Sequence, residues 1–256
     1  MKFKNIIKKV YKLLNFIGFD LIKFFNLFFI IKVIKNYITF KKLGGKNNRF
    51  QLILGQHKSL SGNIDKHYFN QDIRVANLIF EKKPEKHVDI GSRIDGFVSH
   101  IASFRKLEVF DIRKNIINNK NIEFKNINLQ SLEKSYYNYS DSVSCLHTIE
   151  HLGLGRYGDD IDPHGYKKAF LNLINLTKQS GTLYVSFPIA KISRVEFNAH
   201  RVFNPLEIFK WSKNFDLISF DYIDDNGYLK ENIDIKTENF DNLNYGCGIY
   251  TLKIIK

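Results

Sequence analysis

The chain has 256 residues, of which 44% are apolar, so it can form one good-sized domain with extensions. Its two cysteines, Cys145 and Cys247, cannot build a disulfide framework or a zinc site, and a reducing, cytoplasmic compartment fits best. The formal charge of +13 lies mostly in residues 1–46, where eleven lysines and one acid, Asp20, leave only +3 for the rest of the chain. Because a nucleic-acid enzyme more often spreads basic residues around its site, we expect no nucleic-acid partner.

Residues 1–46 are predicted to form a basic, amphipathic extension of two helices that break near Gly18. The longest uncharged run, Phe24–Ile31, is shorter than the roughly 20 residues that span a bilayer, and no signal-peptide cleavage site is expected. Lysines among large apolar side chains suit a helix lying on an anionic surface, here the inner face of the cytoplasmic membrane. Packing on the body, or on a second subunit of a homodimer, stays an equal alternative.

Residues 47–256 are predicted to form an α/β domain. The run FQLILG, Phe50–Gly55, is strand-like. A helix is expected over Asp65–Lys82, with an apolar side formed by Tyr68, Ile73, Ala76, Ile79 and Phe80. Three of its residues, Tyr68, Gln71 and Asp72, could face a ligand, although exposure on the polar side of the helix is the simpler expectation.

The stretch from His87 to Arg113 has the pattern of a first β-α-β unit. A short strand, His87–Ile90, is followed by a turn between two glycines, Gly91 and Gly96, and by apolar residues at helical spacing. Glycine in such a turn lets the backbone approach a ligand, because it has no Cβ. The next strand ends in Asp111, about 20 residues past the first glycine, where a carboxylate can accept hydrogen bonds from a ribose.

Five further strands are expected, at Ile122–Ile127, Ser142–Cys145, Thr182–Phe187, Leu217–Ile223 and Gly248–Ile255. Helices are expected at His164–Lys178 and Pro205–Trp211. Seven strands that alternate with helices, with a long connection between the last two, predict a Rossmann-like, mostly parallel seven-stranded sheet with helices on both faces.

Five motifs, in their order and spacing, resemble the series found in class I S-adenosylmethionine-dependent methyltransferases: DIGSRIDG, VFDIR, NLQSL, SVSCLHTIEH and LTKQSGTLYVSFP. The resemblance covers about residues 66–255. More closely, HVDIGSRIDGFVSH, SCLHTIEHLGLGRYGD and RVEFNAHRVF resemble an uncharacterised family, a domain of unknown function found in bacterial surface-polysaccharide gene clusters. The resemblance implies the class I methyltransferase fold, S-adenosylmethionine as cofactor, and a sugar, sugar-nucleotide or lipid-linked glycan as acceptor.

By this resemblance, nine residues would bind the cofactor: Asp89, Gly91, Ser92, Arg93, Gly96, Asp111, Asn128, Leu129 and His147. Asp89 and Gly91 would lie near its methionine part, Asp111 would hold the ribose, and Asn128 with Leu129 would flank the adenine. The alternatives are a turn-capping role for Asp89 and an exposed strand end for Asp111. Arg93 departs from the family pattern, which has glycine there, and could either pair with the cofactor carboxylate or block the pocket.

Acceptor-side residues are expected in two segments, Cys145–Gly165 and Arg194–Phe203. His200 or His151 could take a proton from an acceptor hydroxyl, Arg201 could hold a phosphate or carboxylate bidentately, and Glu150 is paired with His151 in the motif. A buried polar network is the alternative for the second segment. Substrate contacts are predicted for Arg156, Tyr157, Glu196 and Asn198.

No metal site is predicted, although Asp159, Asp160 and His164 carry suitable ligand atoms. Asp162 and Pro163 are the expected N-cap and first residue of a helix.

Three functions stay open from the sequence. The first is O-methylation of a sugar or sugar-nucleotide hydroxyl in surface-glycan biosynthesis, of capsule or O-antigen. The second is a different reaction on the same fold, with Arg93 remodelling the cofactor pocket, and the third is a membrane-associated, non-catalytic scaffold. The fifth strand ends in SFPI and lacks the Asn/Asp-Pro-Pro-aromatic motif of amino-directed enzymes, which disfavours a nucleic-acid methyltransferase.

Overall fold

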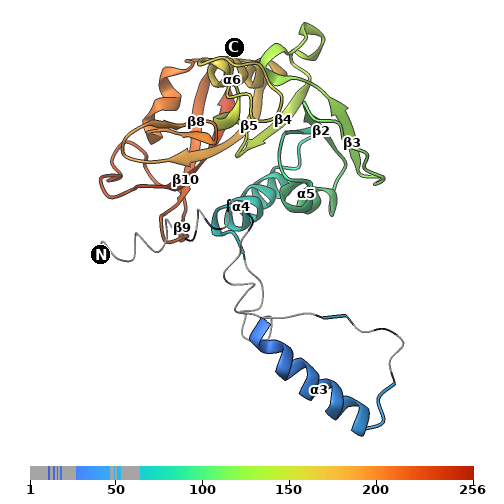
Figure 1. Cartoon of the computed structure of the whole chain (residues 1–256). Coiled ribbons are helices and arrows are strands. Elements are labelled where there is room, and N and C mark those ends of the chain that lie inside the picture. The colour runs from blue at the N-terminus through green and yellow to red at the C-terminus, as the bar shows by residue number, and fades with distance from the viewer. Residues whose placement is uncertain are drawn as a thin grey trace. The chain divides into compact units, whose positions relative to one another are not determined.

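The computed structural model describes residues 11, 14, 16, 18, 27–46, 49, 51, 52 and 64–256 (Figure 1). The chain divides into two compact units, Met1–Ile64 and Asp65–Lys256. Gly18, at the predicted helix break, lies in a turn with a φ of 86°, while its neighbours 17 and 19 are outside the described residues. Most of the predicted strand Phe50–Gly55 also lies outside them, and its two described residues have no strand structure.

The described part of the first unit is mainly helical. A short 3-10 turn, η1 (Leu27–Phe29), leads into the helix α3 (Ile30–Lys42). The helix ends at Leu43, and Gly44 then adopts a positive φ of 84°, a conformation that glycine reaches without steric cost. None of the helices in the described ranges combines the length and apolarity that crossing a bilayer requires.

The second unit is built on an eight-stranded sheet in the order β3-β2-β1-β4-β5-β10-β8-β9. The strands from β3 to β5 pair in parallel, whereas β10 runs antiparallel to both of its neighbours. Their bounds are β1 (His87–Ile90), β2 (Leu107–Asp111), β3 (Ile122–Asn126), β4 (Ser140–Leu146), β5 (Thr177–Ile189), β8 (Phe215–Ile223), β9 (Leu229–Lys230) and β10 (Gly246–Ile254).

The predicted Rossmann-like, mostly parallel sheet is therefore confirmed, with eight strands where seven were predicted. The additional strand β9 has only two residues, which is too short for a periodic pattern to reveal. The expected alternation of strands and helices fails between β2 and β3, where the segment 112–121 contains no helix. The segment 224–245, between β8 and β10, is the expected long connection and contains no helix either.

Helices cover both faces of the sheet, and each face has its own apolar core (Figure 1). One face packs against α4 (Lys66–Lys82), the π-helical turn η3 (Ile94–Val98) and α5 (Ser99–Ala102). The other packs against η4 (Leu129–Ser131), α6 (Gly165–Leu176) and η7 (Pro205–Lys210). The remaining elements are η5 (Lys134–Tyr136), η6 (Ile149–His151) and a separate ribbon of β6 (Arg194–Glu196) with β7 (His200–Val202).

Helix α4 buries only part of the side that the sequence predicted. Ala76 and Ile79 are buried as predicted, but Ile73 and Phe80 are 37% and 56% exposed. The polar Gln71 and Asp72 are buried in addition. Both lie one turn before apolar residues of the same helix face, Val75 and Ala76, and are therefore carried against the sheet. Gln71 accepts a hydrogen bond from the Ser186 hydroxyl and donates one to Asp72, which offsets the cost of burying these groups.

Candidate active site

A cavity of about 540 Å³ lies at the carboxyl ends of β1, β2 and β4. This edge of an open α/β sheet is where such folds bind ligands, and the volume is within the roughly 300–1,000 Å³ of small-molecule sites. Predicted cofactor residues that line the cavity are Gly91, Ser92, Arg93, Asp111, Asn128, Leu129 and His147. Tyr68 of α4, one of three residues of that helix that the sequence placed as possible ligand contacts, also lines it.

The turn after β1 needs glycine for reasons internal to the protein. Gly91 has a φ of 70° and donates its N–H to the carbonyl oxygen of Phe110 at 2.9 Å. A Cβ on Gly91 would lie 2.7 Å from Cγ2 of Thr148, and a Cβ on Gly96 would lie 2.7 Å from Oδ2 of Asp72. The two glycines thus leave room for the side chains of Thr148 and Asp72. Gly96 is not among the residues that line the cavity.

Asp89 lies beneath this turn, and it is not among the residues that line the cavity. Its Oδ1 accepts hydrogen bonds from the hydroxyls of Ser92 (2.8 Å) and Ser144 (2.6 Å), and its Oδ2 accepts one from the Ser92 N–H (3.1 Å). His87 continues the buried network, with Nε2 3.1 Å from the Ser144 hydroxyl and Nδ1 2.8 Å from the Ser142 hydroxyl. The structure therefore gives Asp89 the turn-capping role that was the alternative to direct cofactor contact.

Arg93 does not fill the cavity. Its guanidinium donates to both carboxylate oxygens of Asp95, from Nε at 3.1 Å and from Nη2 at 2.9 Å. The Cζ atom lies 5.4 Å from the ring centroid of Tyr68, and 54% of the side chain is exposed. The side chain lines the cavity and leaves its volume open.

Asp111 ends β2 at the cavity wall and is held by a residue that the sequence analysis missed. Arg113 donates to its carboxylate from Nη2 at 2.6 Å, from Nε at 3.0 Å and from the main-chain N–H at 2.8 Å. The Arg113 guanidinium also lies 4.8 Å from the ring centroid of Tyr157. The acid–x–Arg spacing was the available signal, because a side chain two residues beyond a strand end can fold back onto it.

Asn128 and Leu129 also line the cavity, beyond β3. Asn128 caps η4, since its Oδ1 accepts a hydrogen bond from the Gln130 N–H at 2.9 Å. Leu129 is 5% exposed and contributes an apolar surface.

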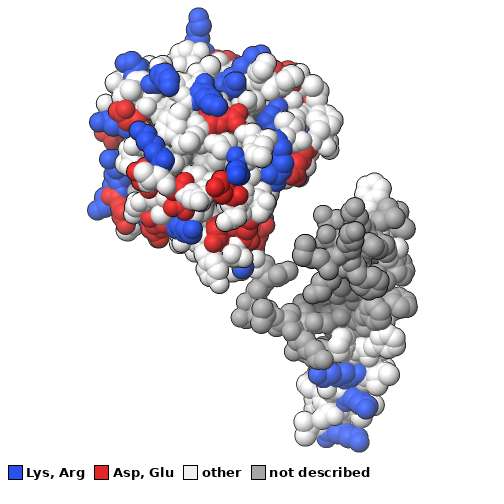
Figure 2. Space-filling model, turned by 90° about the vertical axis from the view of Figure 1, so that its left-hand side faces the viewer, with Lys and Arg blue, Asp and Glu red and all other residues white. Residues whose placement is uncertain are grey.

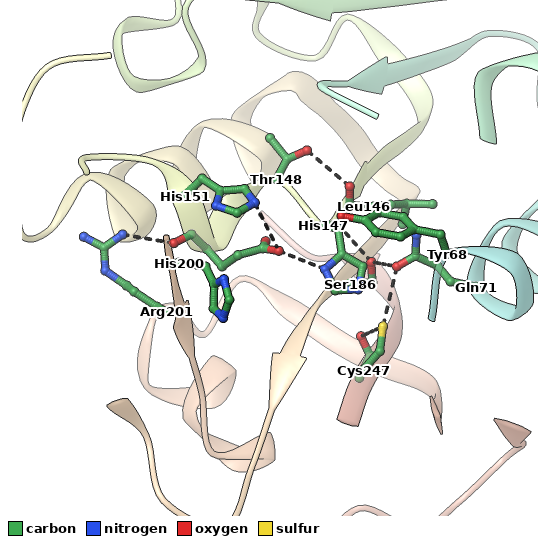
Figure 3. Close-up of polar contacts among 12 residues, drawn as sticks. Tyr68, Gln71, Leu146, His147, Thr148, His151, Ser186, His200, Arg201 and Cys247 are labelled. Carbon is green, nitrogen blue, oxygen red and sulfur yellow. Dashed lines mark hydrogen bonds and ion pairs between the residues drawn. The ribbon is translucent and has the colours of Figure 1, made fainter. Parts of the chain in front are cut away.

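A second, smaller space of about 150 Å³ adjoins the cavity and shares four lining residues with it, Tyr68, His147, His151 and Tyr157. We call it the histidine chamber, because its lining includes four histidines and one buried acid: His67, His147, His151, His200 and Glu150. Figure 3 shows His147, His151 and His200 gathered here, from the end of β4, from η6 and from β7. Arg156 and Tyr245 also line this chamber.

Glu150 lies between two of these histidines and is 1% exposed. Its Oε1 is 2.9 Å from Nδ1 of His147 and 3.7 Å from Nε2 of His151, while its Oε2 has no hydrogen-bond partner in the described part of the chain. Burial by itself lowers the pKa of His147, but Cys247 and the Glu150 carboxylate reverse this and hold it well above its usual value. His147 and Glu150 therefore form a buried ion pair.

His151 has a defined orientation. Its Nδ1 donates to the carbonyl oxygen of Ala199 at 2.7 Å, and Nη1 of Arg156 donates to the same oxygen at 2.9 Å. Burial lowers the pKa of His151, so the ring is neutral near pH 7. Its ring centroid is 5.4 Å from that of Tyr157 and 6.2 Å from that of His200.

The β6–β7 ribbon brings only part of its predicted residues to the site. His200 lines the histidine chamber, and Glu196 approaches it with an oxygen 3.4 Å from Nε2 of His200. Glu196 and Asn198 are exposed and line neither space. The ribbon therefore presents His200 to the site and keeps its turn at the surface.

The prediction that Arg201 binds a phosphate or carboxylate is wrong. Arg201 is 4% exposed, and its guanidinium donates to three main-chain carbonyls, those of Glu150 (3.3 Å), Leu152 (2.7 Å) and Pro163 (3.4 Å). These contacts occupy the fork that would hold a phosphate. Arg201 therefore orders the loop that carries the histidine chamber.

The other acids of this loop also have local roles. Asp159 accepts hydrogen bonds from the N–H groups of Gly153 (2.6 Å) and Tyr157 (3.2 Å). Asp162 accepts from the His164 N–H at 2.8 Å, but the N-cap of α6 is His164, so the predicted N-cap is two residues early. Within the described ranges, no group of three or more His, Cys, Asp or Glu residues could hold a metal ion.

A family model described as "Caenorhabditis protein of unknown function, DUF268" matches residues 98–252, which is more than half of the chain. The chain belongs to the DUF268 family. That description says nothing of surface polysaccharides, so the narrower resemblance stays a prediction. No curated protein matches the sequence of this DUF268 protein.

Solved methyltransferase structures share the fold of this DUF268 protein. The methyltransferase domain of bacterial CtHen1-C is 16% identical, with 76% of this chain and 100% of that chain covered and a TM-score of 0.51. An S-adenosylmethionine-dependent methyltransferase from Clostridium acetobutylicum is 12% identical, with 74% and 92% covered and a TM-score of 0.50. The similarity shows the class I methyltransferase fold.

The network under the turn predicts a distinctive pH dependence of stability. Burial raises the pKa of Asp89 from 3.8 to about 7, so its contribution to stability is present below pH 3.8 and is lost as the pH rises through 7. Burial lowers the pKa of His87 from 6.5 to about 3, so its contribution is present above pH 6.5 and is lost as the pH falls through 3. The two trends oppose each other in the wild-type protein.

In the Asp89→Asn variant the opposing contribution of Asp89 is removed, so the pH dependence of stability that comes from His87 should become visible. We compare the free energy of unfolding of the variant with that of the wild type at each pH. At 1.36 kcal/mol per pKa unit, this difference should shift in favour of the variant by about 2 kcal/mol between about pH 5 and pH 7. Urea unfolding at each pH measures this difference. Asp216→Asn, at an exposed position of β8, should show no such change, and a flat difference for Asp89→Asn would contradict the raised pKa.

The loop-ordering role of Arg201 predicts a stability defect. Arg201→Met keeps an apolar stem but leaves three carbonyls without their donor, and we expect a loss of about 2–4 kcal/mol in the free energy of unfolding. Arg194→Met, in the exposed strand β6, should cost about 0.5 kcal/mol or less. Equal unfolding midpoints for the two variants would show that Arg201 does not hold the loop.

Proposed function

We propose that this DUF268 protein transfers the methyl group of S-adenosylmethionine to a hydroxyl of a sugar or sugar nucleotide in the biosynthesis of a surface glycan. The observation that carries the proposal is the open cavity at the carboxyl ends of β1, β2 and β4, with the Gly91 turn and the Asp111 carboxylate in its wall. The name of the Clostridium acetobutylicum neighbour, an S-adenosylmethionine-dependent methyltransferase, supports this choice of donor.

The residues in the cavity wall fit an adenosine-bearing donor. Ile90, Phe110 and Leu129 offer apolar surface for a base, and Asp111 offers a carboxylate for ribose hydroxyls. Arg113 holds that carboxylate in place from one side. S-adenosylmethionine would supply a methyl group already activated by its positive sulfur, so the protein's task is to align the acceptor and to accept a proton.

A hydroxyl acceptor suits the surroundings of the cavity. The adjoining histidine chamber is polar, and it contains a neutral imidazole, His151, and an acid oxygen without a partner among the described residues, on Glu150. An imidazole near neutral pH is suited to take a proton from a hydroxyl during methyl transfer. Arg156 and Tyr157 lie at the same chamber, where the sequence predicted substrate contacts.

Isothermal titration with S-adenosylmethionine and S-adenosylhomocysteine tests the donor site. We expect both to bind, and Asp111→Ala to weaken binding at least about tenfold, since hydrogen bonds to a charged group contribute about 1.5–3 kcal/mol. Glu123→Gln, on the neighbouring strand β3 and with a side chain 68% exposed, is the matched control and should bind as the wild type does. A folded wild-type protein that binds neither compound would contradict the proposal.

A further inference from the structure

The histidine chamber opens onto the proposed donor cavity, because Tyr68, His147, His151 and Tyr157 line both. A group bound in the chamber is therefore next to a group bound in the cavity. Two of the chamber's histidines, His67 and His200, line the chamber alone. The base that serves a reaction between the two spaces should be one of the shared residues.

We propose that His151 takes the proton of the acceptor hydroxyl, and that the chamber receives a neutral, polyhydroxylated part of the acceptor. This assignment rests on the proposed methyl transfer. In that reaction the carbon–sulfur bond breaks with its electron pair left on sulfur, and a carbon–oxygen bond forms. The O–H bond breaks and its proton passes to Nε2 of His151. The proton then leaves from His151 to solvent.

The tautomer of His151 supports this role. Its Nδ1–H donates to the Ala199 carbonyl at 2.7 Å, so the neutral ring has its lone pair on Nε2. That nitrogen lies 3.7 Å from Oε1 of Glu150, whose charge would stabilise the imidazolium that forms. On the other side, Nη1 of Arg156 lies 3.4 Å from Nδ1 and disfavours a resting charge on the ring.

The other shared histidine is unsuited to the task. His147 forms an ion pair with Glu150 at 2.9 Å, and its pKa is held well above the usual value, so it already carries a proton near pH 7. Its charge also lies directly beside the Glu150 carboxylate. His151 therefore remains as the neutral shared base, with His147, Glu150, Arg156, Tyr157 and His200 as the titratable groups around it.

The polar lining of the chamber indicates the acceptor's chemistry. Besides the four shared residues, it is lined by Asp65, His67, Glu150, Arg156, His200 and Tyr245, all of which have side chains that form hydrogen bonds. A second hydroxyl beside the reacting one would find hydrogen-bond partners among them. The chamber thus favours a diol or polyol over an acceptor with a single hydroxyl.

Nitrogen-15 NMR of histidine-labelled protein saturated with S-adenosylhomocysteine tests the assignment without any acceptor. We expect His151, assigned with the His151→Gln variant, to be neutral and protonated on Nδ1 at pH 7. A charged ring, or one protonated on Nε2, would overturn the role of His151. Failure to bind S-adenosylhomocysteine would instead be a failure of the proposed function.

Methyl transfer to a panel of UDP-, GDP- and dTDP-sugars gives the second readout. Loss of general-base catalysis should reduce kcat about 10²–10⁴-fold in His151→Gln. His67→Gln, at another histidine of the chamber, is the comparison and should lose less. Undiminished transfer by His151→Gln would exclude it as the base, and a wild type that methylates no member of the panel would overturn the polyol acceptor.

A separate observation, in the first unit, carries a second proposal. Helix α3 divides its surface into an apolar arc, with Ile30, Ile31, Val33, Ile34, Tyr37, Ile38 and Phe40, and a polar arc, with Lys32, Lys35, Asn36, Thr39 and Lys42. Lys41, in the last turn, is the one charged residue within the apolar arc. Four of the apolar side chains, Ile31, Ile34, Ile38 and Phe40, are 48–63% exposed. Residues 27–46 contain no acid, and Figure 2 shows lysines beside uncharged residues on the described part of this unit.

We infer that α3 lies in the plane of an anionic membrane surface. Its 13 residues reach only about 20 Å, which suits a helix that lies on a bilayer. The lysines of the polar arc and the absence of acids match anionic lipid headgroups, to which each lysine near the surface contributes about 1 kcal/mol. In Figure 2, by contrast, basic and acidic residues are interspersed over the visible face of the second unit.

Vesicle co-sedimentation of the full chain tests this inference. We expect binding to phosphatidylcholine vesicles that contain about 30% phosphatidylglycerol, weaker binding in high salt, and little binding to pure phosphatidylcholine. Replacing Lys32, Lys35 and Lys42 with Gln should weaken binding about 100-fold, and Ile34→Ser with Ile38→Ser should weaken it as well.

A triple lysine-to-glutamine variant in the second unit, at Lys106, Lys120 and Lys134, is the charge-matched control. It should keep vesicle binding. Binding lost equally in the control, or an α3 that instead holds two copies together in light scattering and leaves anionic vesicles unbound, would overturn the inference.

Discussion

The buried carboxylate of Asp89 joins the parts of the protein from which the cavity is built. It accepts hydrogen bonds from Ser92 in the turn and from Ser144 on the neighbouring strand β4. The Gly91 N–H, bound to the Phe110 carbonyl, fixes the same turn to β2. Three strands and the turn are thereby held in one geometry. The cavity wall depends on this arrangement, although Asp89 itself lies behind it.

A second buried acid organises the histidine chamber, where we propose that the acceptor binds. Glu150 pairs with His147, lies close to His151, and keeps one oxygen without a partner in the described ranges. Its loop is held by Arg201, which donates to three carbonyls, and by the carboxylate of Asp159. The site thus consists of an open cavity with an apolar floor and a polar chamber beside it. This division suits a reaction in which an adenosine-bearing donor meets a hydroxyl.

The sequence predicted the parts of the fold that have clear periodicity. The bounds of β1 and β2 followed from short apolar runs between glycine and acid, and the strand-end position of Asp111 followed from them. Burial of Gln71 and Asp72 was not predictable, because both side chains are polar and the residue that binds Gln71, Ser186, lies far away in the sequence. The role of Arg201 was missed for a similar reason: a sequence does not distinguish a guanidinium that binds carbonyls from one that binds a phosphate.

A crystal structure of the protein soaked with S-adenosylhomocysteine tests the central claim most directly. The account predicts electron density in the cavity, with the adenine against Leu129 and the ribose hydroxyls on Asp111, and with Arg93 still paired to Asp95. An empty cavity at a saturating concentration of the ligand, or a ligand bound elsewhere on the chain, would contradict this account. Only the fold assignment would then remain.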